Sequence, residues 1–247
     1  MLIMKMTNYY MSYHESSCIE GRHMKKETWT DSSHWPKEWT ELEFKTYPRF
    51  PAIELNSNYI TSTMSLVEAL QGRESLRTSS EEILTFEKLS YILKYSFGLK
   101  NITQKNRRYY PSAGARFPLE CYILINNCER IEKGIFHYNV LDDTLEILSK
   151  GNFREQIEDI FGFEWIRESQ AVIFLAAQLG RTIVKYGERG YRFALIEAGH
   201  AMQNFCLLSR SVNLSTTTVG GFADHKVSRL LRFSKDKEIP LYSAVIT

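Results

Sequence analysis

The sequence predicts an α+β fold. Apolar runs typical of buried strands occur at residues 119–126, 171–177 and 241–246, and patterns typical of helices occur at residues 86–97 and from residue 193 onward. These patterns do not alternate regularly along the chain, which favours α+β over a doubly wound sheet. At 247 residues the chain is long enough to bury a sizeable core.

The beginning of the chain differs from the rest. Residues 1–60 contain Trp29, Trp35, Trp39 and several prolines, without a sustained period of either kind. We predict that this segment is an irregular N-terminal extension that packs on one domain formed by residues 61–247.

Three helices are expected in the first part of this domain and its middle. Residues 65–70 suit a short helix or turn. Thr85-Phe86-Glu87-Lys88 is a start signal for a helix over 86–97, which Gly98 stops. A further helix is predicted over residues 152–160.

Five strands are expected, two of them joined as a hairpin. Residues 119–126 carry apolar side chains at both odd and even positions, so we expect a central strand covered on both faces. Residues 134–140 and 144–148 flank Leu141-Asp142-Asp143 as a hairpin. Residues 171–177 (AVIFLAA) are predicted as a second buried strand, and residues 241–246 as the last strand.

The segment KYGERGYRFALIEAGHAMQN spans residues 185–204. Its polar beginning, from Lys185 to Arg192, runs without a break into a stretch with apolar residues on most sides of a helix. That stretch is typical of an interior helix. A polar head on a buried helix is either a solvated end or a site.

Charge and cysteine usage exclude several classes. The formal net charge of +2 gives no broad electrostatic footprint for nucleic acid. No stretch approaches transmembrane length, and the first residues turn polar too soon for a secretory signal, so we expect a cytoplasmic protein without a membrane partner. The four cysteines, Cys18, Cys121, Cys128 and Cys206, show no spacing typical of a metal site. Three of them have apolar or strand-like neighbours, which favours buried free thiols over disulfides or a zinc site.

Three segments carry candidate chemistry, each with a plainer alternative. GRESLR at residues 72–77 brings two guanidinium groups and a hydroxyl together, which suits a phosphate or a solvated loop. Small residues at 112–115 let backbone amides approach a flat ligand, or form a tight loop. Gly220 and Gly221 offer bare amides before a helix, or a turn. No dinucleotide fingerprint, P-loop or nucleophile elbow occurs.

Taken in order, these segments resemble the SagB-type dehydrogenases of the nitroreductase superfamily. The resemblance rests on GRESLR, YPSAGARFPLECYILI, GIFHYNVLDDTLEIL, KYGERGYRFALIEAGHAMQN and VGGFAD, and on YHESS and EFKTYP near the start. Its most specific parts are PSAGA-x-x-P-x-E and K-Y-x-x-R-G-Y-R-x-A-L-x-E-x-G. It covers most of the chain and implies an FMN-binding homodimer whose mixed, mainly antiparallel sheet is flanked by helices.

The resemblance also implies an activity and a site. Members of that family oxidise azolines, formed from Cys, Ser or Thr of a ribosomal precursor peptide, to thiazoles or oxazoles, normally after a cyclodehydratase has acted. By this resemblance the FMN phosphate and ribityl chain would be held by Arg73, Ser75 and Arg77. The isoalloxazine would be lined by Pro111, Ser112, Ala113 and Gly114, with Gly220 and Gly221 facing its other portion.

Lys185 and Tyr186 would be the catalytic pair. Oxidation of an azoline removes a ring proton and a hydride, and the flavin would accept the hydride. To act as the base, Lys185 needs a lowered pKa, which burial or the neighbouring cations Arg189 and Arg192 would supply. Tyr186 would position the ring or relay the proton.

Three other polar residues are expected to be structural. His200 falls within the predicted interior helix, where a lone histidine is more often a core or interface residue than a catalyst. Glu120 and Glu197 lie beside apolar runs, so we expect each to pair with an arginine.

The chain also departs from the family pattern. Many relatives complete the phosphate site with a basic residue after the last strand; here Arg229 or Arg232 could replace it, or Arg73 and Arg77 would suffice. Arg116-Phe117 stands where relatives commonly have a smaller or aliphatic residue and Tyr, which would reshape the substrate face.

Two other functions fit the same resemblance. One is an FMN-dependent dehydrogenase of a cyclic dipeptide or carrier-bound peptide, or a nitroreductase using nicotinamide, because a fold does not fix a reaction. The other is a non-catalytic scaffold subunit that assists the cyclodehydratase. The lack of a nicotinamide motif favours oxygen as the acceptor that reoxidises the flavin.

Overall fold

The computed structural model describes residues 9–18, 33, 35–56, 60, 62–78, 81–100, 107–234 and 237–247. A seven-stranded sheet with the order β1-β4-β3-β2-β5-β7-β6 forms its centre. The strands are β1 (Ala52–Glu54), β2 (Leu119–Ile125), β3 (Gly134–Asn139), β4 (Thr144–Lys150), β5 (Ala171–Gln178), β6 (Thr216–Val219) and β7 (Glu238–Ile246).

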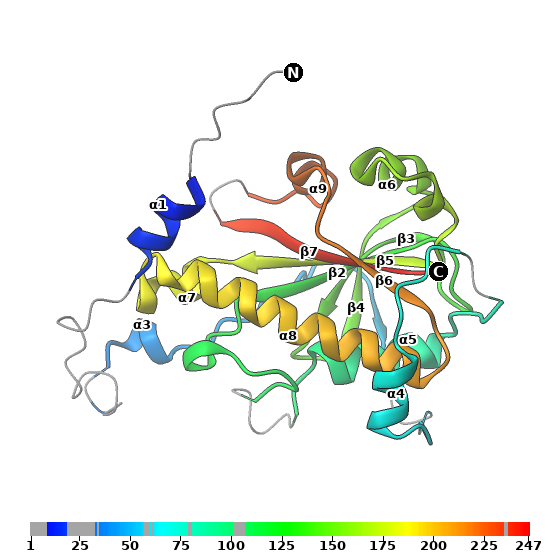
Figure 1. The fold of residues 1–247 in the computed structure, drawn as a ribbon, viewed down its shortest axis with the longest axis horizontal. Coiled ribbons are helices and arrows are strands. Elements are labelled where there is room, and N and C mark those ends of the chain that lie inside the picture. Colours follow the sequence, from blue (N-terminus) through cyan, green and yellow to red (C-terminus); the bar gives the residue numbers. More distant parts are fainter. Residues whose placement is uncertain are drawn as a thin grey trace.

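Helices cover both faces of this sheet (Figure 1). They are α1 (Tyr9–Ser16), α3 (Lys37–Thr40), α4 (Leu66–Gly72), α5 (Phe86–Phe97), α6 (Arg154–Phe161), α7 (Gly180–Tyr186), α8 (Arg189–Ser211) and α9 (Asp224–Leu230), with 3-10 turns η4 (Ala113–Ala115) and η5 (Glu164–Glu168). Helices α8 and α5 pack on one face, and α6 and α9 on the other.

The predicted α+β fold with a mainly antiparallel sheet is confirmed. All neighbouring strands pair antiparallel, and the bridge Ser75–Thr216 is the one parallel pairing within the described residues. Strand β2 is central and buried at every residue, as its apolar side chains at both odd and even positions predict. Cys121 and Ile123 point to the core under α8, and Tyr122 and Leu124 to the core under α6 and α9.

Local signals placed several other elements correctly. The Thr85 hydroxyl accepts from the Lys88 N–H at the start of α5, and Gly98 ends that helix. Ser65 and Glu68 form a reciprocal capping box on α4. The β3–β4 hairpin is also as predicted, and the side-chain oxygen of Asn139 accepts from the N–H of Leu141 in its turn.

Some expectations need correction. Strand β7 begins at Glu238, before the predicted residue 241, because Gln178 of β5 pairs with that residue. Strands β1 and β6 lie in segments for which no strand was predicted. Short elements α1, α3 and β1 occur within the segment expected to be irregular. The division into an extension and a domain stays a prediction.

The polar head and the long helix are not continuous. Gly187, with a φ of 54°, separates α7 from α8. A Cβ at Gly190 would lie 3.0 Å from the backbone N of Ile183, so the two helices meet too closely for a side chain there. Helix α8 is not interior on all sides either, because Leu195 is 41% and Ile196 55% exposed, and His200 is exposed as well.

Burial of three cysteines is confirmed, since Cys121, Cys128 and Cys206 are buried free thiols and Cys18 is exposed. Across the part of the chain that the structure describes, no helix has both the length and the apolar character that crossing a bilayer requires.

Candidate active site

Lys185 lies in the last turn of α7 and is 6% exposed. Its Nζ stands 3.3 Å from the ring centroid of Trp35, with the centroids of Trp39 and Tyr186 at 5.5 and 5.6 Å. A cation near the face of an aromatic ring is stabilised by the ring's quadrupole. We call these three rings and Lys185 the lysine cage.

Burial and charge act on Lys185 in the opposite direction from the rings. Burial, and then the positive charge of Arg116, lower the pKa of the Lys185 ammonium. Arg189 and Arg192, which were expected to lower this pKa, do not supply the positive charge. Arg189 donates to the Ser17 carbonyl, and Arg192 to the His14 carbonyl, so both are turned toward α1.

Arg116 ties the lysine cage to its surroundings. Its Nε donates to the Arg181 carbonyl at 2.7 Å, and its Nη1 donates to the Trp39 and Glu41 carbonyls at 2.9 and 2.8 Å. The indole N–H of Trp39 in turn donates to the Val184 carbonyl at 3.1 Å. One buried guanidinium therefore links the start of α7, the segment after α3 and the loop before β2.

That loop contains the small residues predicted to line a flat ligand. Gly114 has a φ of 59°, and a Cβ there would collide with the Tyr186 hydroxyl and lie 3.3 Å from Lys185 Nζ. Ala115 and Phe117 also have positive φ, which is uncommon for residues with side chains. The Ser112 hydroxyl accepts from the Phe117 N–H at 2.9 Å and closes the turn. The structure thus places Gly114 against Lys185 and Tyr186, with Ser112 and Ala113 next to it in the same loop, while Pro111 is exposed.

Tyr186 and Glu197 complete this cluster. Burial raises the pKa of the Tyr186 hydroxyl, and Arg116 only partly opposes it, so Tyr186 is neutral. Its ring packs edge-on against Phe193 with centroids 5.0 Å apart. Burial raises the pKa of Glu197 to about 8, against the effects of Ser112 and Arg108. Glu197 is 2% exposed and its Oε1 has no hydrogen-bond partner within the described chain.

The two glutamates expected to pair with arginine behave differently. Glu120 Oε1 lies 2.7 Å from Arg181 Nη1, and both side chains are buried, so that expectation is confirmed. Glu197 has Arg108 and Arg181 nearby but no ion pair with either among the described residues, so the pairing expected for it is wrong.

Two of the residues expected to hold the FMN phosphate and ribityl chain, Arg73 and Ser75, form a separate cluster. Arg73 and Ser75 line a cavity of about 130 Å³ together with Gly199, Met202, Gln203, Cys206, Thr216, Thr218 and Tyr242. Ser75 is held there by its bridge to Thr216 in β6. Arg77 is exposed and does not line this cavity. Arg229 and Arg232, the suggested replacements, do not line it either; they line a cavity under α9.

The glycine pair lies close to this second cluster. Gly220 and Gly221 follow β6 directly and are exposed. A Cβ at Gly220 would lie 4.0 Å from the Tyr242 ring, which lines the cavity of Arg73, whereas a Cβ at Gly221 would meet nothing within 4 Å.

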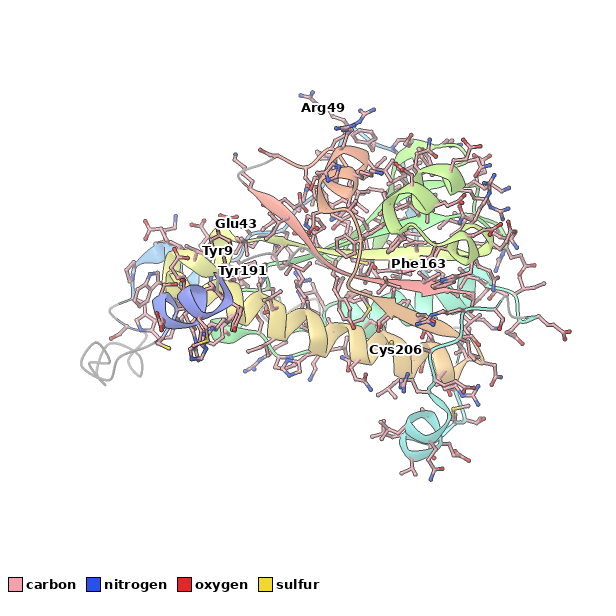
Figure 2. All side chains as sticks on the ribbon, turned by 45° about the horizontal axis from the view of Figure 1, so that its top comes forward. Tyr9, Glu43, Arg49, Phe163, Tyr191 and Cys206 are labelled. Carbon is pink, nitrogen blue, oxygen red and sulfur yellow. The ribbon has the colours of Figure 1, made fainter. Side chains whose placement is uncertain are left out.

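The two clusters lie on opposite sides of α8. Glu197 and Asn204 face the loop before β2, and Asn204 donates to the Tyr109 carbonyl at 3.1 Å. Gly199 and Cys206, each two residues further along, face the cavity of Arg73. Two residues turn an α-helix by about 200°. Figure 2 also shows Tyr191 beside α1 at one end of α8 and Cys206 toward the other end.

Sequence reasoning missed Trp35 and Trp39 as parts of this site, and it named Arg116 only as a residue that would reshape the substrate face. The tryptophans were noticeable as unusual residues in the first segment, but no spacing linked them to Lys185, which lies far along the chain. The aromatic pair four residues apart was the only available signal.

Residues 70–245 match the nitroreductase family, so the chain belongs to this family. A protein of Methanocaldococcus jannaschii, MJ1384, described provisionally as a nitroreductase, is 31% identical over 179 residues, which are 72% of this chain and 88% of the relative. A chain of Anabaena variabilis, described in the same provisional way, has a TM-score of 0.75 at 26% identity over 95% of this chain and 46% of its own.

The SagB-type resemblance is supported by a peptide-processing relative. The microcin B17-processing protein McbC of Escherichia coli is 28% identical over 141 residues, 55% of this chain and 52% of McbC. The E. coli microcin synthetase complex McbBCD, solved with truncated pro-MccB17 bound, contains a chain with a TM-score of 0.63 at 21% identity, over 95% of this chain and 85% of that one. The present chain spans about half the length of McbC and of the Anabaena chain.

Proposed function

We propose that this protein is an FMN-dependent dehydrogenase that oxidises azolines in a peptide to azoles, as one component of a ribosomal-peptide maturation system. One observation carries this proposal: the small-residue loop with Gly114 lies directly against Lys185 and Tyr186. A flat ring at this loop would therefore meet a buried amine and a phenol. The relationship to McbC, a microcin-processing protein, favours a peptide as the substrate.

The residues present fit FMN in two parts. Arg73 offers a guanidinium and Ser75, Thr216 and Thr218 offer hydroxyls, a donor set suited to a phosphate. Their cavity of about 130 Å³ is smaller than the about 300–1,000 Å³ of pockets that hold whole ligands. It therefore accommodates a part of the cofactor, and the remainder must lie elsewhere.

A homodimer would bring the two parts together. Within one chain the loop with Gly114 and the cavity of Arg73 are on opposite sides of α8. The exposed apolar residues favour a second copy as the missing cover: Leu195 and Ile196 on α8, and Leu66, Val67 and Leu70 on α4. Exposed apolar side chains of this kind are typical of an interface.

When bound, FMN supplies the acceptor for the hydride. Lys185 Nζ would take the ring proton, because burial and Arg116 lower the pKa of its ammonium. Once the proton is on Nζ, the faces of Trp35 and Trp39 stabilise the ammonium that has formed. Tyr186, kept neutral by burial, would donate its hydroxyl proton in a hydrogen bond that orients the azoline. The indoles above Lys185 would keep water from the amine.

The proposal is tested first by the visible spectrum and the mass of the cofactor released from purified protein. Stoichiometric FMN is expected, and an azoline peptide should lose the mass of two hydrogens on incubation. Lys185→Ala should lower this oxidation by about a hundredfold or more while FMN stays bound.

Lys185→Arg separates proton removal from charge. Arginine keeps the positive charge but cannot lose its proton near neutral pH, so this variant should be as inactive as Lys185→Ala. Activity retained in the Arg variant would assign Lys185 an electrostatic role. A protein that takes up no FMN, yet binds a cyclodehydratase, would support the scaffold alternative instead.

A further inference from the structure

A larger cavity lies on the face of the sheet opposite α8. It has a volume of about 500 Å³ and is bounded by α6, α9, the end of β4 and the turn at residues 47–50. It is separate from both clusters of the candidate active site. Its lining residues include Tyr47, Phe50, Ile135, Leu148, Phe153 and Ile160.

The rim of this cavity is basic. Lys226 pairs with Asp159 at 2.5 Å, so these two charges compensate each other. Arg229 and Arg232 also line the cavity, and within the described chain neither side chain forms a hydrogen bond or an ion pair. Figure 2 shows Arg49, from the same turn as Phe50, projecting on this side of the molecule. An apolar floor with uncompensated guanidinium groups suits a ligand with an apolar body and carboxylates.

An unpaired strand edge adjoins the cavity. Among the residues that the structure describes, strand β1 pairs with residues 144–146 of β4, and the next backbone contact along this edge is the Ile147 N–H donating to the Pro51 carbonyl at 2.8 Å. Strand β4 continues to Lys150, and its residues Leu148 and Ser149 line the cavity. Among the described residues, no strand covers this end of β4 on its outer side. An extended peptide can add to such an edge.

We propose that this cavity binds an acidic, extended stretch of the peptide substrate, away from the ring that is oxidised. The stretch would lie along the free end of β4, insert a large apolar side chain over Leu148 and Phe153, and place carboxylates at Arg229 and Arg232. The identity of the peptide rests on the proposed function, whereas binding of an acidic peptide does not. Holding the substrate at a second place raises the local concentration of its azoline.

Binding is tested with the full-length, FMN-loaded protein and a fluorescein-labelled synthetic peptide that alternates Glu with Leu and Phe. Fluorescence anisotropy should show saturable binding that weakens as salt is raised. The same peptide with Lys in place of Glu should not bind. Arg229→Gln and Arg232→Gln should each weaken binding by about tenfold or more, since each removes a charge-assisted contact.

Two further variants control for folding and position. Gln156→Trp fills the mouth of the cavity from an exposed position on α6 and should abolish binding. Arg130→Gln removes a guanidinium that is 57% exposed and stacks over Phe86 on the other face of the sheet, so it should bind like the wild type. Circular dichroism and the thermal midpoint should show that all four variants remain folded.

Several outcomes would overturn the proposal. They are no binding of the acidic peptide, equal loss in Arg130→Gln, or undiminished binding in Gln156→Trp. Binding of 4-phenylbutyrate without binding of the peptide would assign the cavity to a small carboxylate instead.

Activity measurements separate this proposal from the function itself. With an azoline peptide that carries an acidic stretch, Arg229→Gln should raise KM about tenfold and leave kcat unchanged. With a peptide that lacks the stretch, wild type and variant should have the same high KM. If the wild type oxidises neither peptide, the proposed function fails, and the anisotropy result still decides whether the cavity binds an acidic peptide.

Discussion

At the scale of single residues, the site depends on how Lys185 is held. Its Nζ is 3.3 Å from the Trp35 centroid, which favours the ammonium, while burial and Arg116 favour the amine. These opposed effects suit the base proposed for azoline oxidation, because its amine must be unprotonated before the reaction and its ammonium must be stable afterwards. Arg116 is the positioning residue, because it acts through backbone carbonyls and charge rather than on the substrate.

Removing the charge of Arg116 should raise the pKa of Lys185. A base works above its pKa, so the acid limb of the pH profile of kcat/KM should move to higher pH in Arg116→Met. Arg116→Lys keeps the charge and should leave the limb in place, even if lost hydrogen bonds lower the rate. A limb that moves equally in both variants would mean that geometry, and not charge, sets the Lys185 pKa.

Gly114 is required both by its backbone and by its neighbours. Gly114→Ala places a side chain in a left-handed conformation, at a cost of about 1–2 kcal/mol, and against the Tyr186 hydroxyl. We expect a lower midpoint in urea unfolding and a loss of azoline oxidation. Gly180→Ala, in helix α7 where a Cβ would meet nothing within 4 Å, is the control and should be at least as stable as the wild type.

At the scale of elements, α8 carries the core on one side and site residues on two others. Glu197 lies on the side of this helix that faces the loop before β2, and burial raises its pKa to about 8. In the unfolded chain a glutamate has a pKa near its ordinary value of about 4.3. The folded protein therefore holds this proton more tightly than the unfolded chain does.

The sign of the resulting pH dependence follows from linkage. Stability from protonated Glu197 is fully present below the unfolded pKa and is lost as pH rises through about 8. Relative to the wild type, Glu197→Gln should gain free energy of unfolding between pH 5 and 8, as measured by urea titration at each pH. The exposed Glu41→Gln is the control for the loss of a carboxylate elsewhere. A difference between Glu197→Gln and the wild type that does not change with pH would contradict the raised pKa of Glu197.

At the scale of the whole molecule, the two clusters of candidate site residues, around Gly114 and around Arg73, lie on opposite sides of α8. Ile196 is 55% exposed on α8, and we expect it to be covered by a second copy. Ile196→Glu should therefore give a monomer and release FMN together, as followed by light scattering and flavin absorbance. Ile83→Glu, which alters another exposed residue at 58%, should leave both unchanged. A monomeric Ile196→Glu that keeps its FMN would show that one chain forms the whole site.

Local signals in the sequence were sufficient for much of the fold. The Thr85 cap and Gly98 set the ends of α5. Apolar side chains at both odd and even positions indicated that strand β2 is covered on both faces. These signals depend on contacts between near neighbours in the chain, so they are visible in a linear pattern. The motif around Gly114 and the one around Lys185 were also recognisable singly, and the structure places them against each other.

The sequence by itself thus determined the fold class, the main strands and helices, and the family resemblance. Only the tertiary structure decided that Trp35 covers Lys185, that Arg116 supplies the nearby charge, and that α8 separates Arg73 from Gly114. Such contacts join residues far apart in the chain, and the periodicity of apolar residues along the sequence does not reveal them. The pattern of α8 also could not distinguish burial inside one chain from an apolar surface left exposed, because both require the same side chains.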